Sequence, residues 1–187
     1  LFLRILKIGG NFITKLGSQH VFDNLEELHS ENNQIKNIDK HTMNKLNSLK
    51  VLNISNNQVE NLEAGTFSSE NKLQVVDISS NKLTVVDPNN FESFKNVSIL
   101  ILHNNSLTEK VITCDNVQKL TNVNVLDLSF NQISEINHCT LHVCEVRERI
   151  EVVASGESVG ENPSEGFDQA RGTQPAGKPD YRRCLAN

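Results

Sequence analysis

Residues 49–67 read LKVLNISNNQVENLEAGTF, and residues 73–91 read LQVVDISSNKLTVVDPNNF. The two stretches share one pattern. Each has apolar residues at its first, fourth and sixth positions, an asparagine at its ninth (Asn57, Asn81) and a phenylalanine at its end (Phe67, Phe91). A unit that recurs after 24 residues indicates a repeat architecture rather than a single globular core.

The asparagine marks the same position in six units, which we number repeats 1 to 6: Asn11, Asn33, Asn57, Asn81, Asn105 and Asn131. The steps between these asparagines are 22, 24, 24, 24 and 26 residues. This period, together with the pattern L-x-x-L-x-L-x-x-N, predicts a leucine-rich-repeat solenoid. We expect an α/β-type right-handed horseshoe of about six repeats over residues 1–144, with a parallel, concave β-sheet.

The spacing of the unit has a physical reason. Side chains alternate along a strand, so the leucines and isoleucines of each unit point inward and the residues between them point outward. We expect each ladder asparagine to bond the backbone of the neighbouring turn, because a buried unpaired group costs roughly 1–3 kcal/mol. A convex spine would contain Val21 or Phe22, Met43, Phe67, Phe91 and Leu141.

Two repeats depart from the pattern. Ser30 takes the place of an inward Leu or Ile in repeat 2, so we expect a small polar hole in the core. Residues 109–119 lengthen repeat 5 and contain Cys114 but no phenylalanine, which predicts a longer loop or a short helix. Leu3 and Leu6 belong to a first strand with only one neighbour, so we expect both to be partly exposed.

The repeats resemble the typical 24-residue class of leucine-rich repeats, found in Toll-like receptor ectodomains and in secreted insect leucine-rich immune proteins. The stretches Leu49–Phe67 and Leu73–Phe91 carry this resemblance. It implies an extracellular glycoprotein or receptor ectodomain that recognises a protein, with roles in innate immunity and signal transduction. Residues 137–144 lack the N-P-x-x-C-x-C cap that is usual in extracellular members, so a cytoplasmic scaffold or adaptor is the alternative.

Composition argues against several classes of function. The chain has 18 basic and 23 acidic residues, and it offers no basic stripe for nucleic acid. No apolar run approaches the roughly 18 residues of a membrane span. Residues 145–187 hold five of the nine glycines and three of the four prolines, so we expect a disordered tail. Within it, only residues 146–154 could add a strand or a helical turn.

Cysteines and sequons bear on the compartment. Three disulfide pairings are possible among Cys114, Cys139, Cys144 and Cys184, and the spacing does not choose between them. Candidate N-glycosylation acceptors are Asn53, Asn96 and Asn104. Asn96 is the favoured acceptor, because it lies in a turn, whereas a glycan on Asn53 would cover the concave face.

Two motifs suggest chemistry, and both have simpler readings. Residues 156–160 match the G-x-S-x-G nucleophile motif around Ser158, but too few residues remain for a hydrolase sheet, and every histidine precedes that serine. His138, Cys139, His142 and Cys144 are zinc-ligand types, yet they crowd into seven residues, whereas structural zinc sites use two separated pairs. We therefore expect no enzyme activity, no cofactor and no metal site.

The outward strand positions would form the binding face. One row is Ile5, Glu27, Val51, Val75, Ile99 and Val125, and the next is Lys7, His29, Asn53, Asp77, Ile101 and Asp127. The large apolar groups Ile101 and Phe130, expected on an exposed sheet, are typical of contact sites. The predicted partner-binding residues are His29, Glu31, Val75, Asp77, Ile99, Ile101, His103, Val125, Asp127 and Phe130. Neither the identity of the protein partner nor the oligomeric state follows from these positions.

Overall fold

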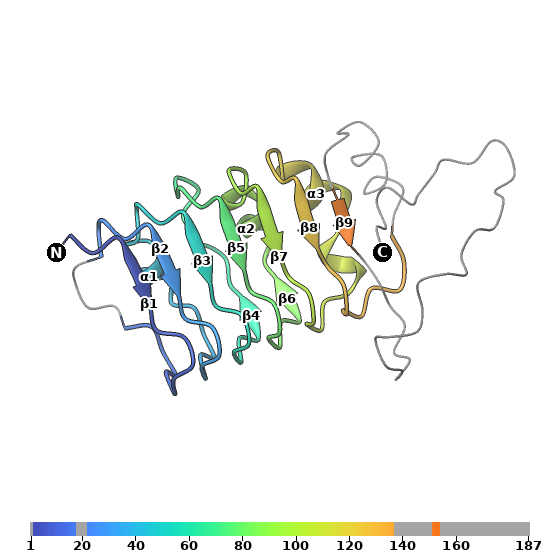
Figure 1. The fold of residues 1–187 in the computed structure, drawn as a ribbon. Coiled ribbons are helices and arrows are strands. Elements are labelled where there is room, and N and C mark those ends of the chain that lie inside the picture. The colour runs from blue at the N-terminus through green and yellow to red at the C-terminus, as the bar shows by residue number, and fades with distance from the viewer. Residues whose placement is uncertain (1, 18–21, 137–150, 154–187) are drawn as a thin grey trace, which may run out of the picture.

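The structure is a computed structural model that describes residues 2–17, 22–136 and 151–153. Among these residues, seven short parallel strands form one sheet in the order β1-β2-β3-β5-β7-β8-β9 (Figure 1). The strands are β1 (Ile5–Lys7), β2 (Glu27–His29), β3 (Val51–Asn53), β5 (Val75–Asp77), β7 (Ile99–Ile101), β8 (Val125–Asp127) and β9 (Glu151–Val153). The predicted leucine-rich-repeat solenoid with a parallel sheet is confirmed.

Each repeat returns from one strand to the next through a turn, an extended segment and, in some repeats, a helix. Two of the extended segments pair as a second parallel sheet, β4 (Asn61–Leu62) with β6 (Val85–Val86). The helices are α1 (Lys40–Met43), α2 (Pro88–Ser93) and α3 (Cys114–Lys119), and a 3-10 turn, η1, spans Glu109–Val111. Asp39, Asp87 and Thr113 cap the three helices with side-chain oxygens. The helix predicted as one option within residues 109–119 is confirmed as α3.

The register of the main sheet agrees with the sequence period. From β2 to β8, the central residue of each strand is buried and is the register partner of the central residue in the next strand. These residues are Leu28, Leu52, Val76, Leu100 and Leu126. The residues on either side of each central residue face outward and are half-exposed from β2 to β8. The alternation thus assigns one face of every strand to the core and the other to solvent.

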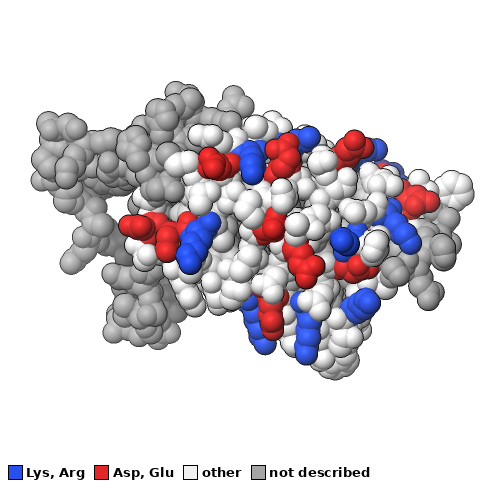
Figure 2. All heavy atoms as spheres, turned by 180° about the vertical axis from the view of Figure 1, so that it is seen from behind, with Lys and Arg blue, Asp and Glu red and all other residues white. Residues whose placement is uncertain are grey.

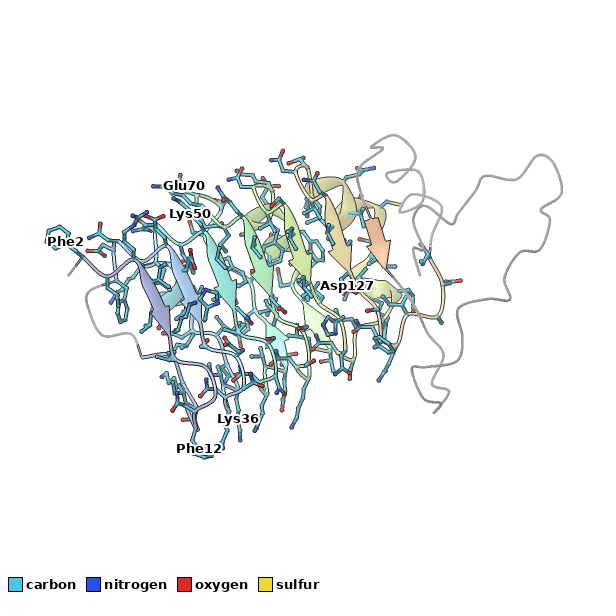
Figure 3. The ribbon with its side chains drawn as sticks, in the orientation of Figure 1. Phe2, Phe12, Lys36, Lys50, Glu70 and Asp127 are labelled. Carbon is cyan, nitrogen blue, oxygen red and sulfur yellow. The ribbon has the colours of Figure 1, made fainter. Side chains whose placement is uncertain are left out.

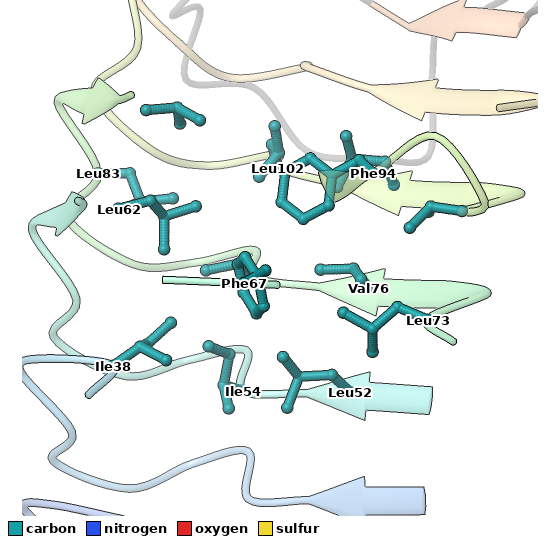
Figure 4. Close-up of a cluster of buried hydrophobic side chains, with 14 of the residues drawn as sticks. Ile38, Leu52, Ile54, Leu62, Phe67, Leu73, Val76, Leu83, Phe94 and Leu102 are labelled. Atoms are coloured by element: carbon teal, nitrogen blue, oxygen red, sulfur yellow. The ribbon is translucent and has the colours of Figure 1, made fainter. Parts of the chain in front are cut away.

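A single apolar core runs between the main sheet and the opposite side of the solenoid (Figure 4). Met43, Phe67 and Phe91 are buried at the predicted spine positions. Phe94, which the sequence analysis did not include, is fully buried, with its ring centroid 5.3 Å from that of Phe67 and 6.4 Å from that of Phe91. Phe22 is partly buried against the core, while Val21 and Leu141 lie outside the described residues.

The asparagine ladder holds successive turns together as predicted at five of its six positions, whereas Asn11 donates only to carbonyls of its own turn. The Asn57 amide donates to the carbonyls of Ser30, Ile54 and Ser55, and its Oδ1 accepts from the backbone N–H of Ile35 at 2.9 Å. The same two-sided arrangement recurs at Asn33, Asn81, Asn105 and Asn131. Since each such side chain bonds both its own turn and the turn before it, the ladder fixes the stacking of adjacent repeats.

The two ends of the solenoid differ. At the first repeat, Leu3 and Leu6 are half-exposed, as expected, and an apolar cavity of about 240 Å³ opens between Ile13, Leu16 and Phe22. At the other end, β9 lies within residues 146–154. The sequence predicted either a strand or a helical turn there, and the strand is confirmed. β9 pairs with β8 and so extends the sheet beyond repeat 6. The remainder of the predicted tail lies outside the described residues.

Candidate functional site

The outward residues of the main sheet form three rows that cross the strands, and we call this surface the open face. The first row is Ile5, Glu27, Val51, Val75, Ile99 and Val125, and the second is Lys7, His29, Asn53, Asp77, Ile101 and Asp127, both paired as the sequence predicts. The third row lies two residues beyond the end of each strand and contains Gly9, Glu31, Ser55, Ser79, His103 and Ser129, of which Ser79 and Ser129 are buried.

The first row is apolar throughout repeats 3 to 6. Val51, Val75, Ile99 and Val125 are register partners in turn, and all four are half-exposed. Strand-forming residues such as valine and isoleucine are common in sheets, so the type of residue alone indicates little. Their continuity across four neighbouring strands, however, leaves an uninterrupted apolar stripe for contact with another molecule.

The second and third rows are linked by a repeated side-chain clamp. Asp77 Oδ1 accepts hydrogen bonds from the backbone N–H and the hydroxyl of Ser79, at 2.9 and 2.6 Å. Asp127 makes the same pair of bonds with Ser129, at 3.0 and 2.7 Å. In repeat 3, Asn53 Oδ1 accepts the equivalent bonds from Ser55. The clamp fixes the direction of the aspartate or asparagine side chain, because its Oδ1 accepts two hydrogen bonds from the following serine.

Repeat 5 interrupts this clamp. Its second-row residue is Ile101 and its third-row residue is His103, and neither takes part in such a bond. Ile101 is the register partner of Asp77 on one side and of Asp127 on the other. The structure therefore places an apolar side chain between two oriented carboxylates, with the half-exposed His103 two residues further along.

Repeat 2 carries a separate polar group of residues. His29 Nε2 lies 3.1 Å from the Glu27 carboxylate, and both residues are half-exposed. The Glu31 carboxylate lies against Gly9, where an added Cβ would stand 2.5 Å from Glu31 Oε1. Glu31 Oε2 is buried without a hydrogen-bond partner among the described residues. Repeat 3 separates this group from the clamps of repeats 4 and 6.

At the edge of the sheet, Glu26 bonds two cations. Arg4 Nε and Lys50 Nζ each lie 2.7 Å from a Glu26 carboxylate oxygen. The hydrogen bonds from Arg4 and then Lys50 lower the pKa of Glu26 to about 2. These ion pairs connect repeats 1, 2 and 3 outside the core. Figure 3 shows Lys50 at the upper edge of the sheet, away from Asp127.

Phe130 lies in the turn after β8, and not on a strand as the sequence analysis placed it. Its backbone has a φ of 54°, and 63% of its surface is exposed. The equivalent turn residues of the preceding repeats also have positive φ, and they are Asn32, Asn56, Ser80 and Asn104. Small polar residues tolerate this left-handed conformation, whereas a bulky side chain is strained in it. An exposed aromatic ring held in this conformation is a reason to suspect a contact site.

The structure brings together most of the residues that the sequence selected. Val75, Asp77, Ile99, Ile101, Val125 and Asp127 lie side by side on β5, β7 and β8. His103 follows β7 in the third row, whereas His29 and Glu31 belong to repeat 2. Ser79 and Ser129 were not among the residues predicted from the sequence, although the recurring spacing Asp-x-Ser was available as a signal.

The three candidate glycosylation acceptors differ in accessibility. Asn96 and Asn104 are exposed, and each donates a long hydrogen bond, at 3.5 Å to the Asn71 carbonyl and at 3.2 Å to the Ser80 hydroxyl. Asn53 is half-buried on the open face, and its Oδ1 is held by Ser55. A sugar on Asn53 would therefore have to disrupt a clamp.

Other chemistry is sparse in the described part of the chain. No cluster of three or more histidine, cysteine, aspartate or glutamate residues there could hold a metal ion, and the candidate ligands at 138–144 lie outside it, as does Ser158.

Cys114 is disulfide-bonded, and the other three cysteines are not described. No described helix is long and apolar enough to cross a membrane. On the face opposite to that in Figure 1, basic and acidic side chains are interspersed (Figure 2).

Comparison with known proteins gives a family and several structural relatives. The family model for the leucine rich repeat matches residues 3–59, 23–83 and 71–133. TLR13, solved in the TLR13-ssRNA13 complex, is 30% identical with a TM-score of 0.58, over 67% of this chain and 18% of that chain. The functional domain of InlJ from Listeria monocytogenes is 22% identical with a TM-score of 0.53, over 72% of this chain and 32% of that chain.

A third relative occurs in the octameric complex of Latrophilin 3, Unc5D and FLRT2, with 18% identity and a TM-score of 0.53, over 71% of this chain and 54% of that chain. The InlJ and FLRT2-complex matches support the fold alone. The chain spans about a fifth to a half of the lengths of these three relatives. Comparison with curated proteins gives no match.

Proposed function

Because this chain belongs to the leucine-rich-repeat family, we propose that it is a non-enzymatic module that binds a protein partner on its open face. Residues 1–144 would form the recognition solenoid and residues 145–187 the tail that follows it, from which β9 (Glu151–Val153) joins the sheet. We assign contact to repeats 2 to 6. The proposed contact residues are His29, Glu31, Val75, Asp77, Ile99, Ile101, His103, Val125, Asp127 and Phe130.

The observation that carries this proposal is the continuous apolar row of Val51, Val75, Ile99 and Val125, which lies beside side chains of fixed orientation. Binding is favoured by apolar surface that loses its water, and specificity comes from polar groups that need not reorganise. Phe130 adds an exposed aromatic ring at the border of the same surface. Aromatic residues are enriched among the residues that dominate binding at protein interfaces.

The similarity to TLR13 supports a place in an extracellular or receptor protein with a role in immune recognition and signalling. The Cys114 disulfide and the exposed acceptors Asn96 and Asn104 also support an oxidising compartment, where disulfides persist and N-glycans are added. The alternative is a cytoplasmic scaffold, which would have neither modification. Mass measurement of protein from secreting cells, with and without glycosidase, separates the two. An unchanged mass and four alkylatable thiols would favour the scaffold.

Photo-crosslinking combined with substitution tests the binding face. A crosslinking residue at Val75 should capture a partner from extracts of the source cells, whereas one at Val85 should not. Val85 is 54% exposed but lies on β6 of the second sheet, so it serves as a matched apolar control. The double substitution Ile101→Glu with Phe130→Glu should abolish capture, and Val85→Glu should preserve it.

Circular dichroism should show the same spectrum for the wild type, the double variant and Val85→Glu. The substituted side chains are half-exposed or exposed, so we expect the changes to leave the fold intact. Equal capture by the wild type and the double variant would contradict the open face as the binding surface. Capture through position 85 but not 75 would move the site to the opposite side of the solenoid.

A further inference from the structure

The open face is charged asymmetrically along the solenoid. No lysine or arginine occupies any position of the three rows in repeats 3 to 6, where the carboxylates are Asp77 and Asp127. Lys7 stands in the second row of repeat 1, and His29 of repeat 2 already has Glu27 beside it. The open face therefore has carboxylates in two places: Glu27 and Glu31 in repeat 2, close to His29, and Asp77 and Asp127 in repeats 4 and 6, where none of the three rows carries a lysine or an arginine.

The two carboxylates have unused hydrogen-bonding capacity. In both residues the clamp to the following serine uses Oδ1 alone. Within the described part of the chain, Oδ2 of Asp77 and Oδ2 of Asp127 form no hydrogen bond and no ion pair. A half-buried carboxylate of fixed direction is a strong acceptor for a guanidinium or ammonium group.

The distance between these acceptors restricts what can bind. Asp77 and Asp127 are each the register partner of Ile101, so two strand spacings separate them, or roughly 9.6 Å. Residues seven positions apart on an α-helix are separated by about 10.5 Å along its axis. A helix laid across β5, β7 and β8 could thus place a basic side chain on each carboxylate and an apolar side chain on Ile101.

We propose that repeats 4 to 6 bind a basic amphipathic segment of a protein partner, with two cationic side chains on Asp77 and Asp127 and an apolar side chain between them on Ile101. This inference rests on the proposed function and specifies the chemistry of the partner. Charge complementarity and the spacing of the acceptors select this occupant over a neutral or an acidic one.

Synthetic helical peptides of about 18 residues provide a direct probe. The test peptide carries two arginines seven positions apart, with leucines three and four positions after the first. One control peptide replaces both arginines with glutamate, and another moves the second arginine to the opposite helical face. Fluorescence anisotropy should show that the test peptide binds the wild-type protein more tightly than either control, and that raising salt from about 0.02 to 0.2 M weakens its binding.

Substitution of the protein locates the binding. Asp77→Asn with Asp127→Asn removes both charges but keeps the Oδ1 acceptors, as Asn53 does naturally in repeat 3. We expect the affinity for the test peptide to fall about tenfold or more. Glu60→Gln with Glu70→Gln is the matched control, because it changes the net charge equally at exposed positions off the open face, and its affinity should stay near that of the wild type.

Three results would overturn the inference: equal binding of the arginine and glutamate peptides, equal binding of the two arginine spacings, or an equal loss of affinity in both double variants. The proposed function can survive each of them. If the double substitution at Ile101 and Phe130 abolishes capture of the natural partner while the substitutions at Asp77 and Asp127 leave it unchanged, the open face is the binding surface but its partner is not basic.

Discussion

Asn57, at the centre of the asparagine ladder, offers the sharpest test of what holds the repeats together. Its substitution by alanine removes four hydrogen bonds, three donated to carbonyls and one accepted from the N–H of Ile35. The consequences for the partners differ. The Ser30 and Ile54 carbonyls keep bonds from Asn33 and Asn81, and the Ser55 carbonyl keeps one from a backbone N–H.

Only the Ile35 N–H would be left buried with no partner. Such a group costs about 1–3 kcal/mol, and the partial loss at three carbonyls adds about 1 kcal/mol, so we expect Asn57→Ala to cost about 2–4 kcal/mol. Asn11 is the matched control, because it is exposed and bonds only carbonyls of its own turn. Asn11→Ala should cost no more than about 0.5 kcal/mol.

Urea unfolding followed by circular dichroism measures both values, with the slope of the transition reporting whether cooperativity is kept. Asn57→Asp adds a pH test, since it keeps an acceptor for Ile35 but turns an oxygen toward three carbonyls. The repulsion raises the pKa of the new carboxyl in the folded state, so this variant should lose stability as the pH rises through that pKa. A cost for Asn57→Ala below about 1 kcal/mol, or equal to that of Asn11→Ala, would refute the ladder as the main polar contact between repeats.

Four further outcomes are expected. Ser30→Leu should raise the free energy of unfolding by about 1–2 kcal/mol in urea, because this fully buried serine occupies an inward position that is apolar in the other repeats; a loss of stability would show that the site is already filled. Phe130→Asn should stabilise the protein by about 1 kcal/mol in thermal unfolding, since asparagine tolerates positive φ, while weakening capture of the partner; unchanged capture would separate this strain from function. The stability that Glu26 contributes should be fully present above its unfolded pKa near 4.5 and lost as the pH falls toward 2, so Glu26→Gln should flatten the acid titration of stability in this range; an unchanged titration would contradict the role of the ion pairs. Amide hydrogen exchange should protect residues 49–54 more than residues 3–8, because the first strand has one neighbour; the reverse order would contradict stability by stacking.

The sequence alone was sufficient for the repeat period, the strand register and the burial pattern. The alternation around Leu52 and Val76 decides which side chains are buried, and the recurring Asn57 and Asn81 set the stacking distance. These features follow from local spacing, because side chains two residues apart on a strand share a face and identical units align when stacked. The open face could therefore be listed residue by residue before any coordinates.

Other features depend on contacts between residues that are far apart in the chain or on backbone conformation. The sequence cannot show that the Phe94 ring packs against Phe67 and Phe91, or that the Glu31 carboxylate lies against Gly9, since packing sets how closely these residues approach. The pattern of apolar residues also placed Phe130 on the sheet, because hydropathy does not report the sign of φ.

The sequence by itself thus determined the solenoid and the order of its outward residues, because a fixed period allows only one way to bury the leucines. Only the tertiary structure decided which oxygens of the open-face carboxylates are hydrogen-bonded and which stay free for a partner. Whether Asp77 and Asp127 keep an oxygen for a partner depends on where the hydroxyls of Ser79 and Ser129 lie, and that is a matter of geometry to within a few tenths of an ångström.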